Sequence, residues 1–215
     1  MEYEPHDRVA KRVMSFASRH FLDMLSCVLI LASLWFYIGV HRTRRTLKTN
    51  APEAFHEGEI VQISGIVDGD EILLLNRLGG KTVLRLVGIK SFDATVSDPL
   101  LSEYGKICFE YLKSTAMDQQ AQLVLDPKRV DTKGRLLGSL LLKDKEGNFT
   151  LNLSEDLIKR GYTLVYTRFD FAQMERYLEA EQAAVNNSAG LWSDSRIKGR
   201  AQMLKTLWNE ERDND

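Results

Sequence analysis

The sequence predicts an α+β protein: a five-stranded OB-type β-barrel with helical insertions, preceded by one transmembrane helix. Three observations predict it. Residues 24–40 form an apolar run without a charge. Beyond Glu59 the chain changes to short apolar runs that alternate with period two, as strands do. Between these runs lie segments with apolar residues at helical spacing, and five strands interrupted by helices are typical of an OB-type barrel.

The chain is expected to begin with a polar tail, 1–20, and a transmembrane helix, 21–41. A spanning helix needs about 20 apolar residues, or roughly 17 at the short end. The aromatic stretch Trp35–Tyr37 lies toward its C-terminal end, where such side chains anchor at headgroups. A buried core helix and a signal peptide are the alternatives. A signal peptide is disfavoured because a polar tail precedes the run and "HRTRR", not a cleavage motif, follows it.

A basic linker, 42–58, is expected next, and its "HRTRRTLK" stretch gathers basic residues close to the apolar run. The N-terminal tail is also basic, but its charges are more spread out. The positive-inside rule therefore favours a main domain on the cytoplasmic or matrix side.

The main domain is expected over 59–193. Helices are predicted over Ser102–Met117, Leu151–Lys159 and Phe171–Val185. The predicted strands are Glu59–Val67, Glu71–Leu75, Thr82–Ile89, Gln122–Leu125 and Leu136–Leu142.

The C-terminal tail, 194–215, is predicted to be helical, because Ile197, Ala201, Leu204 and Trp208 fall on one face. Such a helix either packs back on its own domain or docks on a partner protein. The sequence leaves both possibilities open, with self-packing favoured.

The composition narrows the classes of partner and site. The net charge is −1, and the main domain has more acidic than basic residues, whereas DNA-binding domains are typically basic. Nucleic acid is therefore not an expected partner. Cys27 lies in the apolar run and Cys108 in a predicted helix, so no disulfide framework is indicated. The four histidines show no zinc-type spacing.

Six stretches in order, from Glu59 to Trp192, resemble the staphylococcal nuclease (thermonuclease-like) family. The stretches are "VDGDEILL", "RLVGI", "SEYGKICFEYL", "VDTKGRLLGSLLL", "LNLSEDLIKRGYTLVY" and "YLEAEQAAVNNSAGLW". The family includes membrane-anchored eukaryotic relatives, some of them mitochondrial. The resemblance therefore makes the mitochondrial inner membrane a candidate location for a single-pass membrane protein.

The resemblance implies calcium-assisted phosphodiester cleavage and assigns site positions. Asp70 matches the first calcium ligand, and Arg85 and Arg135 match the two arginines that clamp the phosphate. Asp93 matches a glutamate that orients the attacking water. Lys90 stands where the family has its second calcium-ligating aspartate.

The lysine changes the local charge by two units and puts a cation where a cation should bind. At about 4 Å, like charges repel by roughly 4 kcal/mol at an effective dielectric near 20. We therefore expect Asp70, Lys90 and Asp93 to converge on one pocket without a metal, with Lys90 paired to one or both carboxylates. Arg85 would then be an ion-pair partner. Two alternatives are an alignment that moves Asp93 into the ligand role and a lysine that binds phosphate as a point charge.

The sequence thus favours a non-catalytic, membrane-anchored nuclease-like domain that is an accessory subunit of a membrane complex. Its expected partners are the lipid bilayer and other subunits, bound through the transmembrane or the C-terminal helix. No cofactor is expected. The alternative is an active endonuclease or phosphodiesterase that uses calcium, with Arg85, Asp93 and Arg135 as catalytic residues. A metal-free nucleic-acid binder of OB type would need interleaved basic and aromatic residues, which Val67–Ala94 lacks.

Overall fold

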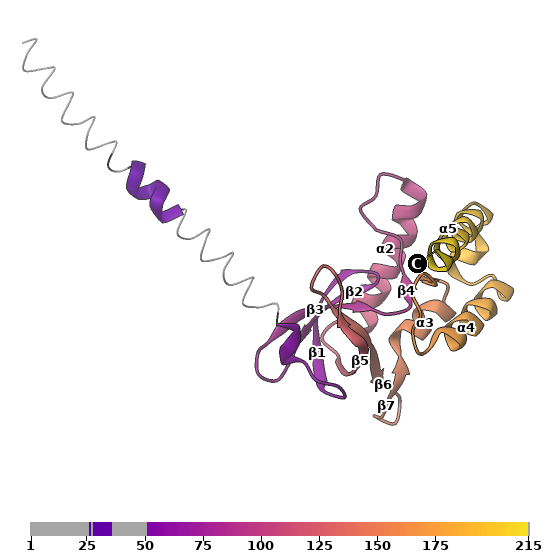
Figure 1. Cartoon of the computed structure of the whole chain (residues 1–215), viewed down its shortest axis with the longest axis horizontal. Coiled ribbons are helices and arrows are strands. Elements are labelled where there is room, and N and C mark those ends of the chain that lie inside the picture. Colours follow the sequence, from indigo (N-terminus) through magenta and orange to yellow (C-terminus); the bar gives the residue numbers. More distant parts are fainter. Residues whose placement is uncertain (1–25, 27, 36–50, 215) are drawn as a thin grey trace, which may run out of the picture. The chain divides into compact units, whose positions relative to one another are not determined.

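The computed structural model describes residues 26, 28–35 and 51–214, and the chain separates into two compact units, 1–48 and 49–215 (Figure 1). In the first unit the described residues are helical and exposed, with Trp35 81% accessible. Among the described residues, no helix is both long and apolar enough to cross a membrane. The predicted tail 1–20, and most of the predicted transmembrane helix 21–41, lie outside the described residues.

A closed five-stranded barrel forms the body of the second unit, which confirms the predicted OB-type barrel with helices. The strands are neighbours in the order β3-β2-β1-β5-β6, and a parallel pairing of β3 with β6 closes the ring. Their alternate residues fill the interior, as Ile72 and Leu74 do on β2 with no exposed surface. The barrel strands are β1 (Ile60–Asp68), β2 (Glu71–Leu75), β3 (Lys81–Leu86), β5 (Gln120–Val130) and β6 (Leu136–Lys143).

Three short strands were not predicted. β7 (Phe149–Asn152) extends the sheet beside β6, while β4 (Ile89–Lys90) pairs with β8 (Leu164–Val165) in a separate ribbon. The prediction of one strand over Thr82–Ile89 was wrong at its end, because Gly88 adopts a φ of 77° and turns the chain.

The helices lie close to their predicted positions. The Asp98 side chain accepts hydrogen bonds from the first turn of α2, and the Asn152 side chain caps α3 in the same way. The helical segments of the second unit are η1 (Pro52–Ala54), α2 (Pro99–Thr115), α3 (Leu153–Lys159), α4 (Met174–Asn186), η2 (Gly190–Ser193) and α5 (Ser195–Asp213).

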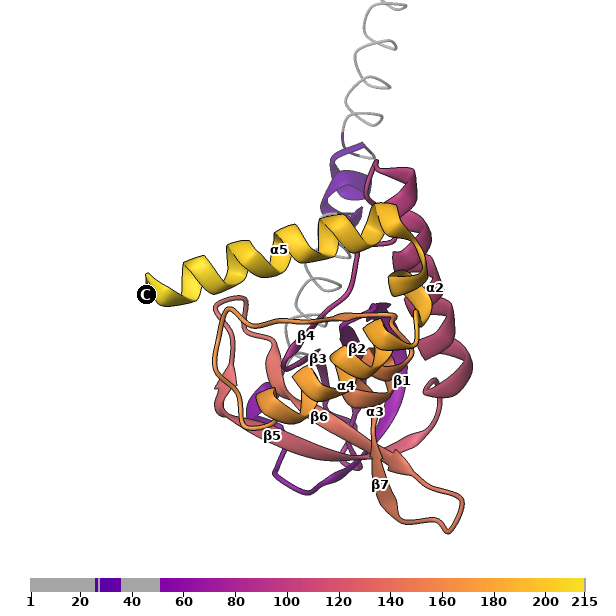
Figure 2. The same cartoon turned by 90° about the vertical axis from the view of Figure 1, so that its right-hand side faces the viewer.

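The C-terminal helix α5 packs back on its own domain (Figure 2). Ile197 and Ala201 are fully buried in a second apolar cluster, and Leu204 and Trp208 pack against that cluster. Lys205 forms an ion pair with the buried Glu181 of α4. Of the two possibilities that the sequence left open, the structure therefore supports self-packing.

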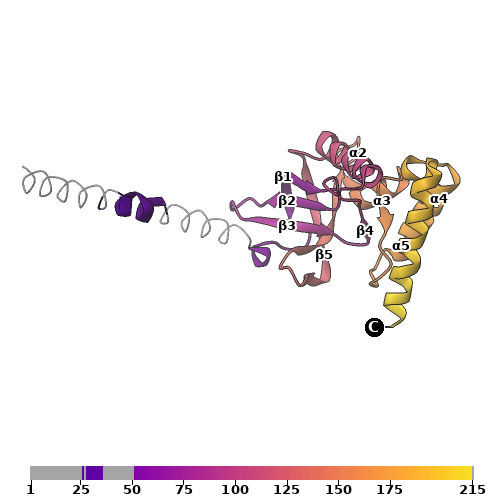
Figure 3. The ribbon, with the colours of Figure 1, turned by 90° about the horizontal axis from the view of Figure 1, so that it is seen from above.

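The folded domain also begins before the predicted boundary at Glu59. Phe55, which falls in the predicted linker 42–58, has no exposed surface and belongs to the main core. The β2–β3 turn and η1 lie at one end of the barrel, and α4 and α5 lie at the other (Figure 3).

Candidate functional site

The turn between β1 and β2 carries Asp70 into the interior, where the residue has no exposed surface. At Gly69 the backbone of the turn lies against the side chains of Ser91 and Cys108. A Cβ at this position would lie 2.6 Å from the Ser91 Cβ and 2.9 Å from the Cys108 Sγ. Only glycine fits without displacing one of them. Glycine at this point therefore lets the turn approach β4 and α2 closely enough to bury the carboxylate.

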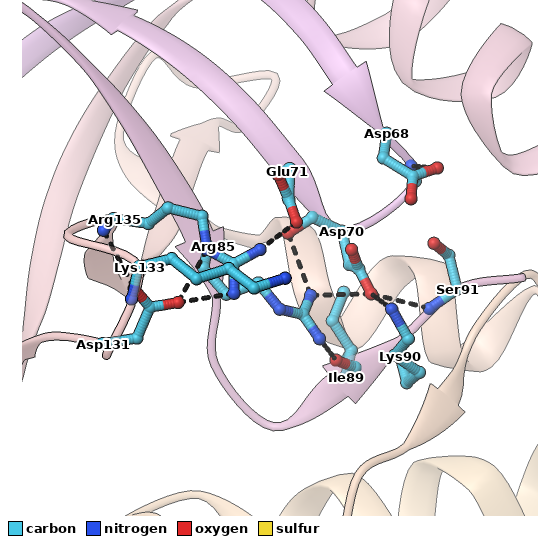
Figure 4. Close-up of polar contacts among 11 residues, drawn as sticks. Asp68, Asp70, Glu71, Arg85, Ile89, Lys90, Ser91, Asp131, Lys133 and Arg135 are labelled. Atoms are coloured by element: carbon cyan, nitrogen blue, oxygen red, sulfur yellow. Dashed lines mark hydrogen bonds and ion pairs between the residues drawn. The ribbon is translucent and has the colours of Figure 1, made fainter. Parts of the chain in front are cut away.

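One oxygen of the Asp70 carboxylate gathers three donors (Figure 4). Oδ2 lies 2.7 Å from Arg85 Nη1 and 3.2 Å from Lys90 Nζ. The backbone N–H of Ser91 donates to the same oxygen at 3.0 Å. Oδ1 is buried without a hydrogen-bond partner. Lys90, expected at the position of the second ligand, thus contacts Asp70, the residue expected to be the first.

Arg85 is engaged on both of its terminal nitrogens. Nη1 also donates to the Asp70 carbonyl at 3.1 Å, and Nη2 donates to the Ile89 carbonyl at 2.9 Å. The side chain is 11% exposed. Arg85 therefore ties the β1–β2 turn to β4, which is a structural use of the guanidinium.

Arg135 is held by two carboxylates of its own. Its Nε donates to Asp131 Oδ2 at 2.6 Å, and its Nη1 forms an ion pair with Glu71. Burial works against the charged form, but Asp131 and Glu71 outweigh it and raise the pKa of Arg135. Glu71 lies directly opposite Arg85 in the β2–β3 register. In the parallel β3–β6 pairing Arg85 is the partner of Leu137, two residues after Arg135, so the two arginines come from neighbouring parts of one sheet.

Asp93 forms no direct ion pair with Lys90 in the described part of the chain. Its Oδ1 accepts hydrogen bonds from both the backbone N–H and the hydroxyl of Thr95, at 2.7 Å each. These bonds hold the pKa of the Asp93 carboxyl below its ordinary value, and the Lys90 ammonium is close enough to contribute to that lowering. Of the two carboxylates that Lys90 was expected to pair with, the structure thus shows direct pairing with Asp70 alone, because the Asp93 side chain caps its own exposed loop.

Sequence reasoning did not identify Glu71 and Asp131 as partners of Arg135. A signal for each was present. Asp131 begins the turn "DTKGR", in which its Oδ1 accepts from the N–H groups of Lys133 and Arg135. Glu71 follows the acidic turn directly, and on β2 it lies beside the strand that carries Arg85.

A calcium ion, which the resemblance implies, does not fit the residues present. Calcium takes six to eight oxygen ligands, several of them carboxylates. Here the one buried carboxylate is shared by a guanidinium and an ammonium. Across residues 26, 28–35 and 51–214 there is no group of three or more His, Cys, Asp or Glu side chains that could hold a metal.

Asp68, the other carboxylate of the turn, has its own environment. Its Oδ1 accepts from the Gly69 N–H at 2.8 Å. Burial raises the pKa of the Asp68 carboxyl, and the nearby Asp70 charge adds to that effect. Burial and the Asp70 charge therefore both work against the ionised form of Asp68.

The family model described as staphylococcal nuclease homologue matches residues 83–194 of the chain. None of the curated proteins compared with the chain matches it. The matched region contains Arg85, Lys90, Asp93 and Arg135, begins after Asp70, and spans more than half of the 215 residues. The barrel, its helices and the order of these residues agree with that match, and the chain belongs to the staphylococcal nuclease homologue family.

Proposed function

We propose that this domain is a non-catalytic member of its family and acts as an accessory or interaction subunit of a membrane protein complex. The single observation that carries the proposal is the contact of Lys90 Nζ with Asp70 Oδ2 at 3.2 Å. An ammonium at that point occupies the place in which a divalent cation would meet the carboxylate. At about 4 Å, a divalent cation and a lysine repel by roughly 8 kcal/mol at an effective dielectric near 20.

The other inherited residues support the same proposal. Arg85 donates hydrogen bonds to two backbone carbonyls and forms an ion pair with the buried carboxylate of Asp70. Arg135 forms ion pairs with the carboxylates of Glu71 and Asp131. Asp93, which would have to orient a water, caps Thr95 instead. A phosphate would have to break these ion pairs before it could bind either guanidinium.

Membrane anchoring is the second part of the proposal. It rests on the uncharged run 24–40, on the basic stretch that follows it, and on the exposed apolar side chains of the helical residues 28–35. We propose that this segment spans the mitochondrial inner membrane or another membrane as a single pass. Carbonate washing of membranes from cells that express the full chain tests it: we expect retention, and release into the soluble fraction would exclude a spanning helix.

The interaction role has two candidate surfaces, the anchor and α5. On α5 the side chains of Met203 and Leu207 are 62% and 45% exposed on the face away from the domain. Purification from detergent-solubilised membranes, followed by measurement of the native mass, would separate a subunit of a complex from a chain that occurs alone.

An active calcium-dependent endonuclease or phosphodiesterase is the alternative, favoured by one observation. Asp70, Arg85 and Arg135 are still gathered at one end of β2, β3 and β6, as a phosphodiester site would need (Figure 4).

Cleavage of single-stranded DNA and RNA by the detergent-purified full chain, with calcium and with a chelator, separates the two functions. We expect no calcium-dependent cleavage. The matched variants are Arg85→Ala, in the cluster, and Arg77→Ala, on an exposed turn. Robust calcium-dependent cleavage that Arg77→Ala preserves, and that Arg85→Ala abolishes in a sample shown to be folded by circular dichroism, would establish the active enzyme and end the non-catalytic proposal.

A further inference from the structure

The turn between β2 and β3 presents an apolar side chain between two cations. Leu78 is 91% exposed, the highest value among the large apolar residues that the structure describes. Arg77 and Lys81 beside it are also exposed. A single exposed leucine is common on soluble domains and needs no explanation alone. Leu78 is of interest because the segment through which the chain enters the domain lies beside its turn.

The N-terminal segment of the domain is bonded to this turn. The Ala51 N–H donates to the Lys81 carbonyl at 3.2 Å, and Asn76 Nδ2 donates to the Ala54 carbonyl at 3.0 Å. The Oδ1 atom of Asn76 also accepts hydrogen bonds from the backbone N–H groups of Leu78 and Gly80, and these bonds fix the shape of the turn. The chain therefore enters the folded domain against the turn that carries Leu78.

A third basic side chain borders the same place. Arg129 of β5 donates through Nη2 to the Phe55 carbonyl at 2.8 Å, and it is exposed, as are its neighbours Lys128 and Val130. Glu53 and Glu57 are exposed acidic side chains close to this surface. Arg77, Lys81 and Arg129 therefore outnumber these two carboxylates, although the main domain as a whole is acidic.

The sequence before Ala51 limits how far this surface can lie from a membrane. Residues 41–50 separate the apolar run 24–40 from the domain, and a chain of that length reaches at most about 35 Å when fully extended. Those residues carry four further basic side chains, Arg42, Arg44, Arg45 and Lys48. Basic residues close to a membrane are attracted to anionic lipids.

We propose that this end of the barrel, made of Arg77, Leu78, Lys81 and Arg129, docks on anionic phospholipid headgroups with Leu78 inserted among them. The proposal rests on the membrane anchoring proposed above. Leu75 is opposite Lys81 at one end of the β2–β3 pair, and Glu71 is opposite Arg85 at the other, about 14 Å away. The docked domain would therefore hold its Asp70 cluster away from the bilayer.

The test uses the full chain reconstituted in liposomes of phosphatidylcholine, with or without phosphatidylserine. An environment-sensitive fluorophore is attached at Leu78→Cys or, as a matched control, at Leu207→Cys on α5, in a Cys27→Ser background. Leu207 is an exposed leucine of α5, the helix at the opposite end of the barrel from the β2–β3 turn (Figure 3), and Cys108 is buried and so protected from the label. Because the two leaflets have the same composition, both orientations of the chain report alike.

We expect lipid-attached quenchers to quench the probe at position 78 several-fold more than the probe at position 207 in anionic liposomes. The double variant Arg77→Glu, Lys81→Glu should lose most of that difference, since each basic residue near an anionic surface strengthens association by roughly fivefold. Circular dichroism of the same sample checks that the variant is folded.

Flotation of the liposomes separates this proposal from the anchoring on which it rests. A chain that floats but shows equal quenching at both positions would overturn the docking and leave the anchor intact. A chain that does not float would overturn both. Equal quenching at position 78 in neutral and anionic liposomes, or quenching that survives the charge reversal, would overturn the recognition of anionic headgroups.

Discussion

Replacing Arg85 by alanine should destabilise the domain by about 3–5 kcal/mol, the usual cost of removing one partner of a buried ion pair. The arginine is 11% exposed and its partner Asp70 is fully buried. The carboxylate would keep only Lys90 and the Ser91 N–H, and the carbonyls of Asp70 and Ile89 would each lose a donor. For a domain of this size the melting temperature should fall by about 6–20 °C.

Lys90→Ala provides the internal comparison. Its side chain is 43% exposed, so solvent screens its pairing with Asp70, and the expected loss is about 0–1 kcal/mol. Urea unfolding of residues 49–215, followed by circular dichroism, would rank Arg85→Ala, Lys90→Ala and the exposed control Arg77→Ala.

Equal unfolding midpoints for Arg85→Ala and Arg77→Ala would refute the argument. Such a result would mean that the guanidinium contributes nothing to the fold, as expected of a side chain reserved for a ligand. A loss for Lys90→Ala as large as that for Arg85→Ala would refute the ranking by exposure.

Three further predictions concern the metal, the tail and the topology. Lys90→Asp should bind calcium measurably more tightly than the unmodified chain in calorimetry, because it restores a carboxylate, and equal affinities would show that more than this ligand is missing. The pKa of Asp194, the N-cap of α5, is lowered from 3.8 to about 2, chiefly by its hydrogen bond with Arg196. A carboxyl whose pKa is lowered by folding stabilises the folded state at pH values above its unfolded pKa, and this stabilisation is lost as the pH falls through the folded pKa. Asp194→Asn should therefore remove part of the acid-induced loss of helicity between pH about 4 and 2. Asn148 is exposed and begins the glycosylation sequence Asn-Phe-Thr. In a domain on the cytoplasmic or matrix side this asparagine should remain unmodified. A mobility shift on endoglycosidase treatment would show that the domain lies on the opposite side of the membrane.

The barrel could be predicted because its signals are local. Alternation over β1 and β2 and the turn residues between them are contained in short stretches, and β1, β2, β3 and β6 lie within three residues of their predicted ranges. β5 runs five residues beyond its predicted end at Leu125. β4 and β8 could not be predicted in the same way. Each has two residues, and the pairing of Ile89 with Val165 joins segments far apart in the sequence. No periodicity can be read from two residues.

The candidate site was predictable in part for a different reason. The neighbourhood of Asp70, Arg85 and Lys90 follows from the family order of the motifs, and the structure brings these three together. The direct pairing of Asp93 with Lys90 was not found because a local interaction competes with it: an aspartate can accept hydrogen bonds from a threonine two residues later, and Asp93 does so. Family order places a residue on the chain but does not say which way its side chain turns.

The retention of Asp70 and Arg85 is weak support for catalysis, because the fold itself needs both. An isolated buried carboxylate is very costly, so a chain that keeps Asp70 in the interior requires a cation beside it. Arg85 supplies that cation and also joins the β1–β2 turn to β4 through the Ile89 carbonyl. A domain under selection for folding alone would therefore keep this pair. Lys90 is different, because its exposed ammonium is not required to bury Asp70, yet it stands against the carboxylate that a metal would use. Under the proposed function, we therefore expect the identity of residue 90, more than the presence of the arginines, to distinguish a folded relative from a working nuclease.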